Sequence, residues 1–194
     1  MPRPRFESLR LHVAVLAFAG VVAACTTVPP APPADSNDVL SGRLALRVEP
    51  LASEAPRSVS AAFDLRGDSR AGTLGLSTPL GSMLAQARWS PAEVVLTTPR
   101  ETRRFASLDE LTREALGESV PIEAWFDWLR GRPWPGAASA PLDAATSAPS
   151  DPPASGFRQL GWRVDLSRFG AGTIAATRES PAPVVTVRIR LDGT

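Results

Sequence analysis

Hydrophobic and polar residues alternate along most of the chain after residue 39, and this period of two limits the fold more than any other feature. In Leu40–Val48, Leu44 and Leu46 share one face of a strand, whereas Arg43 and Arg47 share the opposite face. Such alternation is typical of a strand with one buried and one solvated face. The same pattern predicts further strands at about residues 59–66, 74–76, 83–89, 93–98, 102–105, 157–166, 173–176 and 184–191.

The period changes to that of an α-helix between residues 107 and 131. Ser107 followed by Glu110 is a capping box, which predicts a helix that starts there and stops at Gly117. Pro121 predicts the start of a second helix that stops at Gly131. The apolar stripe of this second helix consists of Ile122, Trp125, Phe126 and Leu129. The following segment, residues 133–156, is dense in Pro, Ala and Ser, and we interpret it as a mobile loop.

The order of these elements predicts a mainly β (α+β) fold, in which two helices interrupt one antiparallel sheet of about eight or more strands. The apolar face of such a sheet must be covered, and the two short helices are the only cover that the pattern offers. Either the sheet folds on itself around a solid core, or an apolar cavity remains between sheet and helices. The pattern of residues leaves both outcomes open.

The inventory of reactive side chains argues against most enzymes. The only histidine is His12, the only cysteine is Cys25, and the chain contains no lysine. The part after Cys25 therefore has no imidazole base, thiol nucleophile, amine nucleophile or His/Cys metal site. A serine or carboxylate hydrolase stays as an alternative, but we find no GxSxG motif. We expect no catalytic residues, no metal and no cofactor, and a net charge of +1 predicts no nucleic-acid partner.

The N-terminus has the pattern of a bacterial lipoprotein signal peptide, which we assign to residues 1–24. Three arginines precede an apolar run over residues 11–24, which is shorter than the roughly 20 residues of a transmembrane helix. The run ends in Val-Ala-Ala-Cys, similar to a lipobox, so we expect Cys25 to be the lipid-attachment residue. Thr26 at the next position favours the outer membrane, and residues 25–38 form a Pro-rich tether. An ordinary cleaved signal with a free thiol is the alternative.

Residues 39–194 form the expected folded domain, and four of its motifs resemble the LolB family. The motifs are LSGRLALRV (40–48), LSTPLGS (76–82), WLRGRP (128–133) and GFRQLGWRV (156–164), which follow in the family's order. The resemblance implies an unclosed antiparallel half-barrel, capped by short helices, that encloses a hydrophobic cavity for acyl chains. It also implies a lipid-anchored protein on the periplasmic face of the outer membrane. In that role it accepts client lipoproteins from the carrier LolA and inserts them into the inner leaflet, without a cofactor. A monomer is expected.

The resemblance also suggests individual site residues. Leu80, in the TPLG turn, matches a leucine that protrudes and takes part in membrane insertion; the alternative is that Leu80 folds back onto the rim of the sheet. Face assignments suggest candidates for contact with acyl chains, although ordinary core packing explains each of them as well. These candidates are Phe63, Leu65, Leu74, Leu76, Trp125, Trp128, Leu129, Trp162, Val187 and Ile189.

Two further functions compete with lipoprotein delivery. A related lipid-binding or envelope-assembly lipoprotein with the same curved sheet would bind lipid without delivering it. A structural lipoprotein with a solid core would bind no apolar ligand. The sequence pattern does not specify client preference, the contact surface for the carrier, the cavity volume or the opening of its lid.

Overall fold

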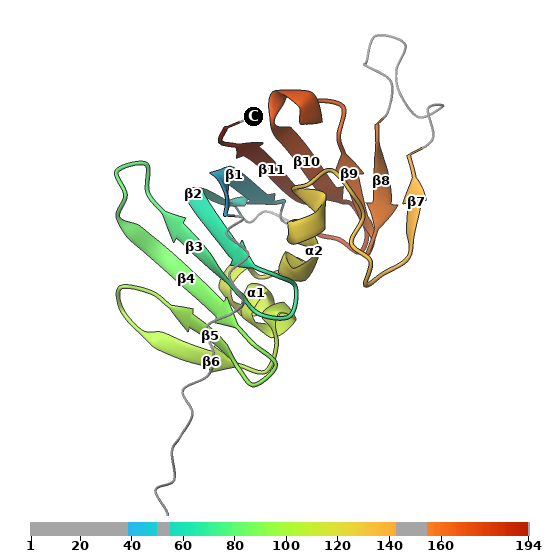
Figure 1. Ribbon diagram of the computed structural model, residues 1–194. Helices are drawn as coiled ribbons and strands as arrows, with labels where there is room; N and C mark the ends of the chain where they lie inside the picture. Colours follow the sequence, from blue (N-terminus) through green and yellow to red (C-terminus); the bar gives the residue numbers. More distant parts are fainter. Residues whose placement is uncertain (1–38, 50–54, 143–154, 194) are drawn as a thin grey trace, which may run out of the picture. The chain divides into compact units, whose positions relative to one another are not determined.

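A computed structural model of the protein describes residues 39–49, 55–142 and 155–193, and within them eleven strands form one antiparallel sheet (Figure 1). The order across the sheet is β6-β5-β4-β3-β2-β1-β11-β10-β9-β8-β7, and the sheet does not close on itself. The strands are β1 (Leu40–Val48), β2 (Arg57–Gly67), β3 (Gly72–Ser77), β4 (Met83–Trp89), β5 (Val94–Thr97), β6 (Thr102–Phe105), β7 (Ser139–Pro141), β8 (Gly156–Gln159), β9 (Trp162–Asp165), β10 (Thr173–Arg178) and β11 (Val185–Leu191). The mainly β architecture predicted from the sequence pattern and the unclosed sheet implied by the family resemblance are both confirmed.

The first strand is also the central one. β1 pairs with β2 on one side and with β11, the last strand in the chain, on the other. In this register Leu44 lies opposite Ala61 on one side and opposite Ile189 on the other. The pairing of β1 with β11 therefore joins the strands before the helices to those after them.

The alternation seen in the sequence corresponds to two different environments. Along β1, Leu44 and Leu46 are buried, whereas Arg43 and Arg47 are exposed on the opposite face. Because side chains of a strand point alternately to its two faces, the alternating sequence places every second residue in the core. The leucines of β1 thus face the core, and its arginines face solvent.

Two helices cover the apolar face of the sheet (Figure 1): α1 (Leu108–Leu116) and α2 (Ile122–Trp128). The Ser107 half of the capping box predicted for α1 is present, because Ser107 Oγ accepts from the Glu110 N–H at 3.1 Å. Glu110 Oε2 accepts at 2.7 Å from the N–H of Ala106, one residue before the N-cap, and not from that of Ser107. Gly117 is the C-cap of α1, as the sequence predicts. A 3₁₀ turn, η2 (Phe169–Ala171), precedes β10.

The structure corrects two of our expectations for the region after α2. The first part of the predicted 133–156 loop contains β7, an edge strand that pairs with β8 and tolerates Pro141 because an edge strand can lack a ladder donor. Residues 143–154 lie outside the described residues. The single strand expected at 157–166 is a hairpin, because Leu160 and Gly161 both have positive φ, at 53° and 77°. This geometry reverses the chain between β8 and β9.

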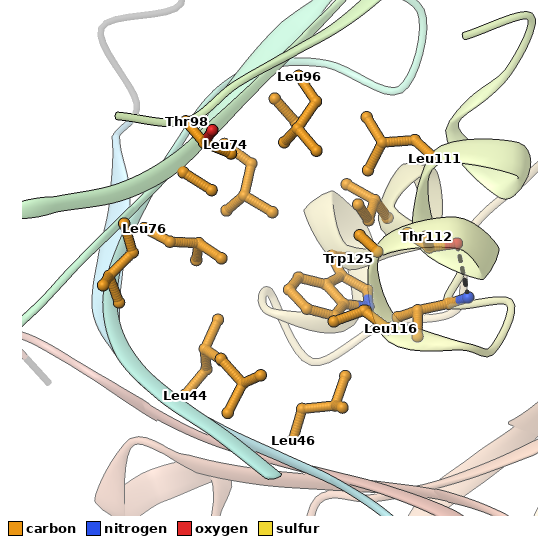
Figure 2. A pocket seen from close by; sticks show the side chains of 17 residues that line it. Leu44, Leu46, Leu74, Leu76, Leu96, Thr98, Leu111, Thr112, Leu116 and Trp125 are labelled. Atoms are coloured by element: carbon orange, nitrogen blue, oxygen red, sulfur yellow. Dashed lines mark hydrogen bonds between the residues drawn. The ribbon is translucent and has the colours of Figure 1, made fainter. Parts of the chain in front are cut away.

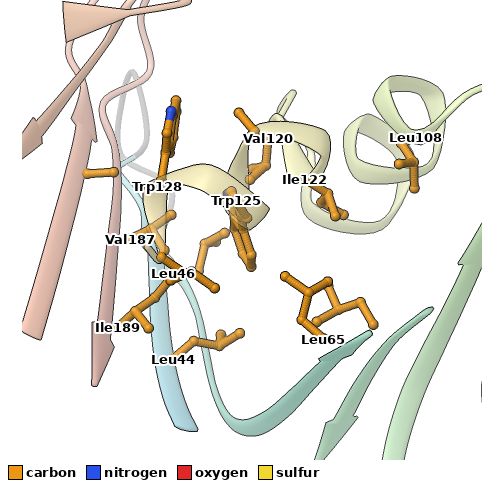
Figure 3. Packing of buried hydrophobic residues seen from close by; sticks show 14 of the residues in the cluster. Leu44, Leu46, Leu65, Leu108, Val120, Ile122, Trp125, Trp128, Val187 and Ile189 are labelled. Carbon is orange, nitrogen blue, oxygen red and sulfur yellow. The ribbon is translucent and has the colours of Figure 1, made fainter. Parts of the chain in front are cut away.

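The core lies between the sheet and the helices (Figure 3). Leu65 from β2, Val187 from β11 and Trp125 from α2 all belong to one hydrophobic cluster, and each is at most 5% exposed. Two short helices therefore bury side chains from both halves of the sheet.

No helix in the described part of the chain is long and apolar enough to cross a lipid bilayer. The predicted signal peptide (1–24), Cys25 and the tether (25–38) lie outside the described residues.

Candidate functional site: an apolar cavity under the helices

A cavity of about 250 Å³ lies between the first half of the sheet and the helices (Figure 2). Strands β1 to β5 supply one wall, and the segment from α1 to α2 supplies the other. The lining residues are Leu44, Leu46, Val59, Leu74, Leu76, Leu84, Ala85, Ala87, Leu96, Thr98, Leu111, Thr112, Ala115, Leu116, Val120, Ile122 and Trp125. The sequence pattern left open whether a cavity remains, and the structure contains one.

The two threonine side chains in this lining are both hydrogen-bonded to backbone groups of the protein. Thr112 Oγ1 donates to the Asp109 carbonyl at 3.2 Å and accepts from the Val120 N–H at 3.1 Å. Thr98 Oγ1 donates to the Glu101 carbonyl at 3.2 Å. No charged side chain is among the lining residues. The cavity can therefore bind a hydrocarbon through dispersion contacts and through the removal of apolar surface from water. It offers few hydrogen-bonding groups for a polar ligand.

One side of the cavity is deep and the other reaches the surface. The deep wall includes Leu44, Leu74 and Trp125, each 5% exposed. Leu84 from β4 and Ala115 from α1 line the cavity and are also exposed. Residues that do both lie at its opening, so the cavity meets solvent between the start of β4 and the C-terminal half of α1.

The structure brings three of the ten predicted acyl-chain candidates together at the cavity: Leu74, Leu76 and Trp125. The other seven are buried in the hydrophobic cluster and are not among the lining residues: Phe63, Leu65, Trp128, Leu129, Trp162, Val187 and Ile189. This cavity thus lies over the half of the sheet that is formed by β1–β5.

Over the other half, aromatic side chains pack together. The ring of Trp128 lies 6.3 Å from that of Phe157 and 6.2 Å from that of Trp162, measured between centroids. Buried Gln159 ties this cluster to the chain after α2. Its Oε1 accepts from Trp128 Nε1 at 2.8 Å and from the Trp134 N–H at 2.9 Å. Trp128 and Trp162 therefore contact each other and their neighbours here, as in an ordinary core.

Most of the lining residues were not among the sequence candidates. Leu44 and Leu46 of β1 and Leu111 and Leu116 of α1 could be assigned to the apolar faces of their elements, but not to a cavity. Their periodicity is the only signal in the sequence, and it is the same for a solid core. Leu84 carried no such signal, because strict alternation assigns it to the opposite face from its cavity-lining neighbour in β4.

Leu80 lies at the tip of the β3–β4 connection and is 94% exposed. The turn is closed by hydrogen bonds from the Gly81 N–H to the Thr78 carbonyl at 2.9 Å and from the Thr78 N–H to the Ser82 carbonyl at 2.8 Å. Gly81 has φ +84°, which lets the chain leave the turn without strain. The leucine side chain thus lies in solvent rather than against the rim of the sheet.

Charged groups contact the helical segment outside the cavity. Arg178 of β10 is buried, forms an ion pair with Glu118 in the α1–α2 connection and lies 5.7 Å from the centre of the Trp162 ring. Glu123, in the first turn of α2, is half-buried, and this burial raises the pKa of its carboxyl group above the usual value. The negative charge of Asp109 raises this pKa further. Among the described residues, no group of three or more His, Cys, Asp or Glu side chains is placed to hold a metal ion.

Comparison with known proteins gives one consistent result. The family profile described as Outer membrane lipoprotein LolB matches residues 39–192. A protein from Bordetella petrii named Outer-membrane lipoprotein LolB is 35% identical over 175 residues, 87% of this chain and 85% of its own. Its namesake from Bordetella parapertussis is 34% identical over 195 residues, 97% of this chain and 96% of its own. A third, from Cupriavidus metallidurans, is 31% identical over 190 residues, 96% of this chain and 88% of its own.

Proposed function

This chain belongs to the LolB family of outer-membrane lipoproteins, and from that premise we propose that it receives lipoproteins from a periplasmic LolA-type carrier and inserts them into the outer membrane. The acyl chains of the client enter the apolar cavity, and no bond is made or broken. Cys25, in the predicted lipobox, carries the anchor that keeps the receiver at the inner leaflet.

The apolar lining of the cavity is the observation that carries this proposal. Three acyl chains hold on the order of 40 CH₂ groups, and each costs about 0.8 kcal/mol to expose to water. A client can therefore cross the periplasm only if its chains are sheltered throughout, and transfer from one apolar cavity to another satisfies this requirement. The hydroxyl groups of Thr98 and Thr112, which also line the cavity, are hydrogen-bonded within the protein.

The cavity has to enlarge when a client enters. Its volume of about 250 Å³ is below the roughly 300–1,000 Å³ typical of pockets for drug-sized ligands. The wall that can move is the helical one, because the sheet wall is held by ladders of hydrogen bonds between its strands. We therefore assign the movable cover over the cavity to α1 and the start of α2.

Leu80 is our candidate for contact with the membrane. A leucine side chain that moves from water into acyl chains gains roughly 1.5–3 kcal/mol. Leu80 is 94% exposed, so nearly all of its surface is available for this transfer.

Transfer can be measured with the full-length lipoprotein in vesicles of phosphatidylethanolamine and phosphatidylglycerol, to which a carrier loaded with a fluorescent lipoprotein is added. We expect the cargo to leave the carrier and to pellet with the vesicles. Ala87→Phe, which fills the cavity, should keep the cargo on the carrier. Leu80→Glu should leave receipt intact and reduce insertion on the order of tenfold, because the charge opposes entry into the bilayer.

Two control variants match these substitutions in chemistry but not in position. Ala45→Phe adds the same ring on the solvent face of β1, and Leu160→Glu adds the same charge at another hairpin tip. Both should behave as the unaltered protein does. If the unaltered protein binds the acyl chains but the cargo never enters the vesicles, the protein is a lipid-binding lipoprotein without delivery, and the proposal is wrong.

A further inference from the structure

Apolar surface gathers beside the opening of the cavity. Five large hydrophobic side chains among the described residues are strongly exposed: Val39, Leu80, Met83, Leu84 and Leu160. Three of them fall within residues 80–84. Isolated exposed hydrophobic residues are common on protein surfaces, but a contiguous group usually contacts something.

Leu84 belongs both to this group and to the cavity. It lines the cavity and is 39% exposed, and the residue before it, Met83, is 45% exposed. An apolar surface therefore continues from the cavity wall, through Leu84, to Met83 on the outside.

An irregularity in the sheet explains how Leu84 reaches the cavity. Adjacent residues of a regular strand point to opposite faces, yet Leu84 and Ala85 both line the cavity. The register between β3 and β4 shifts at this point: Leu76 pairs with Ala85, but Ser77 pairs with Met83, so Leu84 is skipped. An extra residue of this kind bends the strand and redirects a side chain. Here it brings a leucine to the rim of the cavity.

The path from the cavity to the tip of the β3–β4 turn is short. Leu84 follows Leu80 by four positions, and a chain of that length spans at most about 14 Å. One leaflet of a bilayer has a hydrocarbon thickness of about 15 Å, which its acyl chains span. An acyl chain whose end has reached the membrane at Leu80 can therefore still have its other end inside the cavity.

The opposite lip of the opening presents an apolar residue next to charges that are already paired. Ala115 is exposed on α1, and the two charged residues before it each form an ion pair. Arg113 pairs with Asp109 within the helix, and Glu114 pairs with Arg103 of β6. Neither side chain needs a further partner of opposite charge, so this lip does not compete for the polar head of a client.

From these observations we propose an exit route: the acyl chains of a client pass from the cavity into the membrane between Leu84 of β4 and Ala115 of α1, along Met83. This inference rests on the proposed function and adds to it the path of release. Met83 and Leu84 are then contacts for the departing chains, and Leu80 marks the place where the membrane begins.

The test separates receipt of the cargo from its release. The full-length lipoprotein in phosphatidylethanolamine and phosphatidylglycerol vesicles receives a lipoprotein whose acyl chains carry a photoreactive diazirine. Met83→Gln should leave departure from the carrier unchanged and slow entry into the bilayer on the order of tenfold, and Leu84→Gln should slow entry as well. Illumination during release should attach the cargo to residues 83–84 of the unaltered protein. Leu160→Gln is the matched control, because Leu160 is as exposed as Met83, at 45%, and lies outside the route.

Normal release by both Gln variants, or equal slowing by Leu160→Gln, would overturn the exit route while the proposed function stands. Photoproducts confined to residues away from the opening would also overturn it. If the unaltered protein takes no cargo from the carrier, the proposed function itself fails. Because Met83 is not part of the cavity lining, a defect in Met83→Gln cannot come from a damaged cavity wall.

Discussion

At the scale of single residues, Glu123 is a carboxylate in an unfavourable position. It lies half-buried in the first turn of α2, and desolvation, together with the charge of Asp109, raises its pKa. The folded protein thus binds this proton more tightly than the unfolded chain does. The contribution of this tighter proton binding to the free energy of unfolding is therefore fully present below the ordinary pKa of 4.5. It is lost as the pH rises through the raised pKa of Glu123 in the folded protein.

We therefore expect Glu123→Gln to be more stable than the unaltered protein at pH 7, with a difference that shrinks as the pH falls toward 4.5. Urea unfolding followed by tryptophan fluorescence at several pH values measures both free energies of unfolding. Glu101→Gln, at an exposed position between β5 and β6, is the control. A gap between Glu123→Gln and the unaltered protein that stays constant with pH would contradict this prediction.

The residues that the sequence identified best are those whose role is local. Leu80 was predicted to lie at a turn because Pro79 and Gly81 are turn-forming residues on either side of it. Gln159 could not be identified, because its four hydrogen bonds go to Trp128, Trp134 and Ala137, more than twenty residues earlier in the chain. Contacts of that separation depend on the finished fold, and a glutamine in a strand carries no sign of them.

At the scale of elements, Arg178 links the helical cover to β10. Its guanidinium forms an ion pair with Glu118 and donates to the Ser119 carbonyl at 3.3 Å. Arg178→Met leaves Glu118 with its charge but without this partner, so we expect a loss of about 3 kcal/mol in the free energy of unfolding. The double variant with Glu118→Gln should recover part of this loss. Both are measured by urea unfolding.

Arg188→Met is a suitable control for that experiment. Arg188 lies on the neighbouring strand β11, but on the exposed face. This substitution should change the stability by no more than about 0.5 kcal/mol. An equal effect of Arg178→Met and Arg188→Met would show that the link to the helical cover does not stabilise the protein.

The elements themselves were predictable where a period extends over many residues. β1, both helices and β11 fall close to their expected positions. The β8–β9 hairpin was missed because its turn uses Leu160 at positive φ, where Asn, Asp or Gly is usual. β7 was missed because three residues are too few to show alternation, and Pro141 argued against a strand.

At the scale of the whole molecule, the contact between β1 and β11 holds the two halves of the sheet together, and Gly42 makes it close. A Cβ atom at Gly42 would lie 2.1 Å from the Arg190 carbonyl oxygen, so the backbones would have to separate. We expect Gly42→Ala to cost about 2–3 kcal/mol in the free energy of unfolding, as overpacking does. Gly75→Ala in β3 is the control, because its Cβ would meet only the Asp64 carbonyl oxygen, at 3.9 Å. Equal stabilities of the two variants in urea would contradict this prediction.

The sequence predicts a sheet with two helices over it, but not how the space between them is divided. A cavity lies over the half formed by β1–β5, whereas Trp128, Phe157 and Trp162 pack over the other half. Both halves have the same alternation of apolar residues. Whether a half contains the cavity or packed side chains depends on which face of α2 contacts which strand. These contacts are set by the pairing of β1 with β11, by the hydrogen bond of Gln159 to Trp128 and by the ion pair of Arg178 with Glu118.

The two helices have a further property, which comes from where the chain enters and leaves them. They connect β6 to β7, the two opposite edges of the open sheet (Figure 1). The segment that contains both helices therefore crosses the concave face of the sheet from one edge strand to the other. If the sheet flattens, its edges move apart and the helical segment is pulled toward the sheet. If the sheet bends more strongly, the edges approach each other and the helical segment can move away from it. The volume of the cavity thus depends on the curvature of the sheet, and a force that acts on either edge strand would change the space available to bound acyl chains.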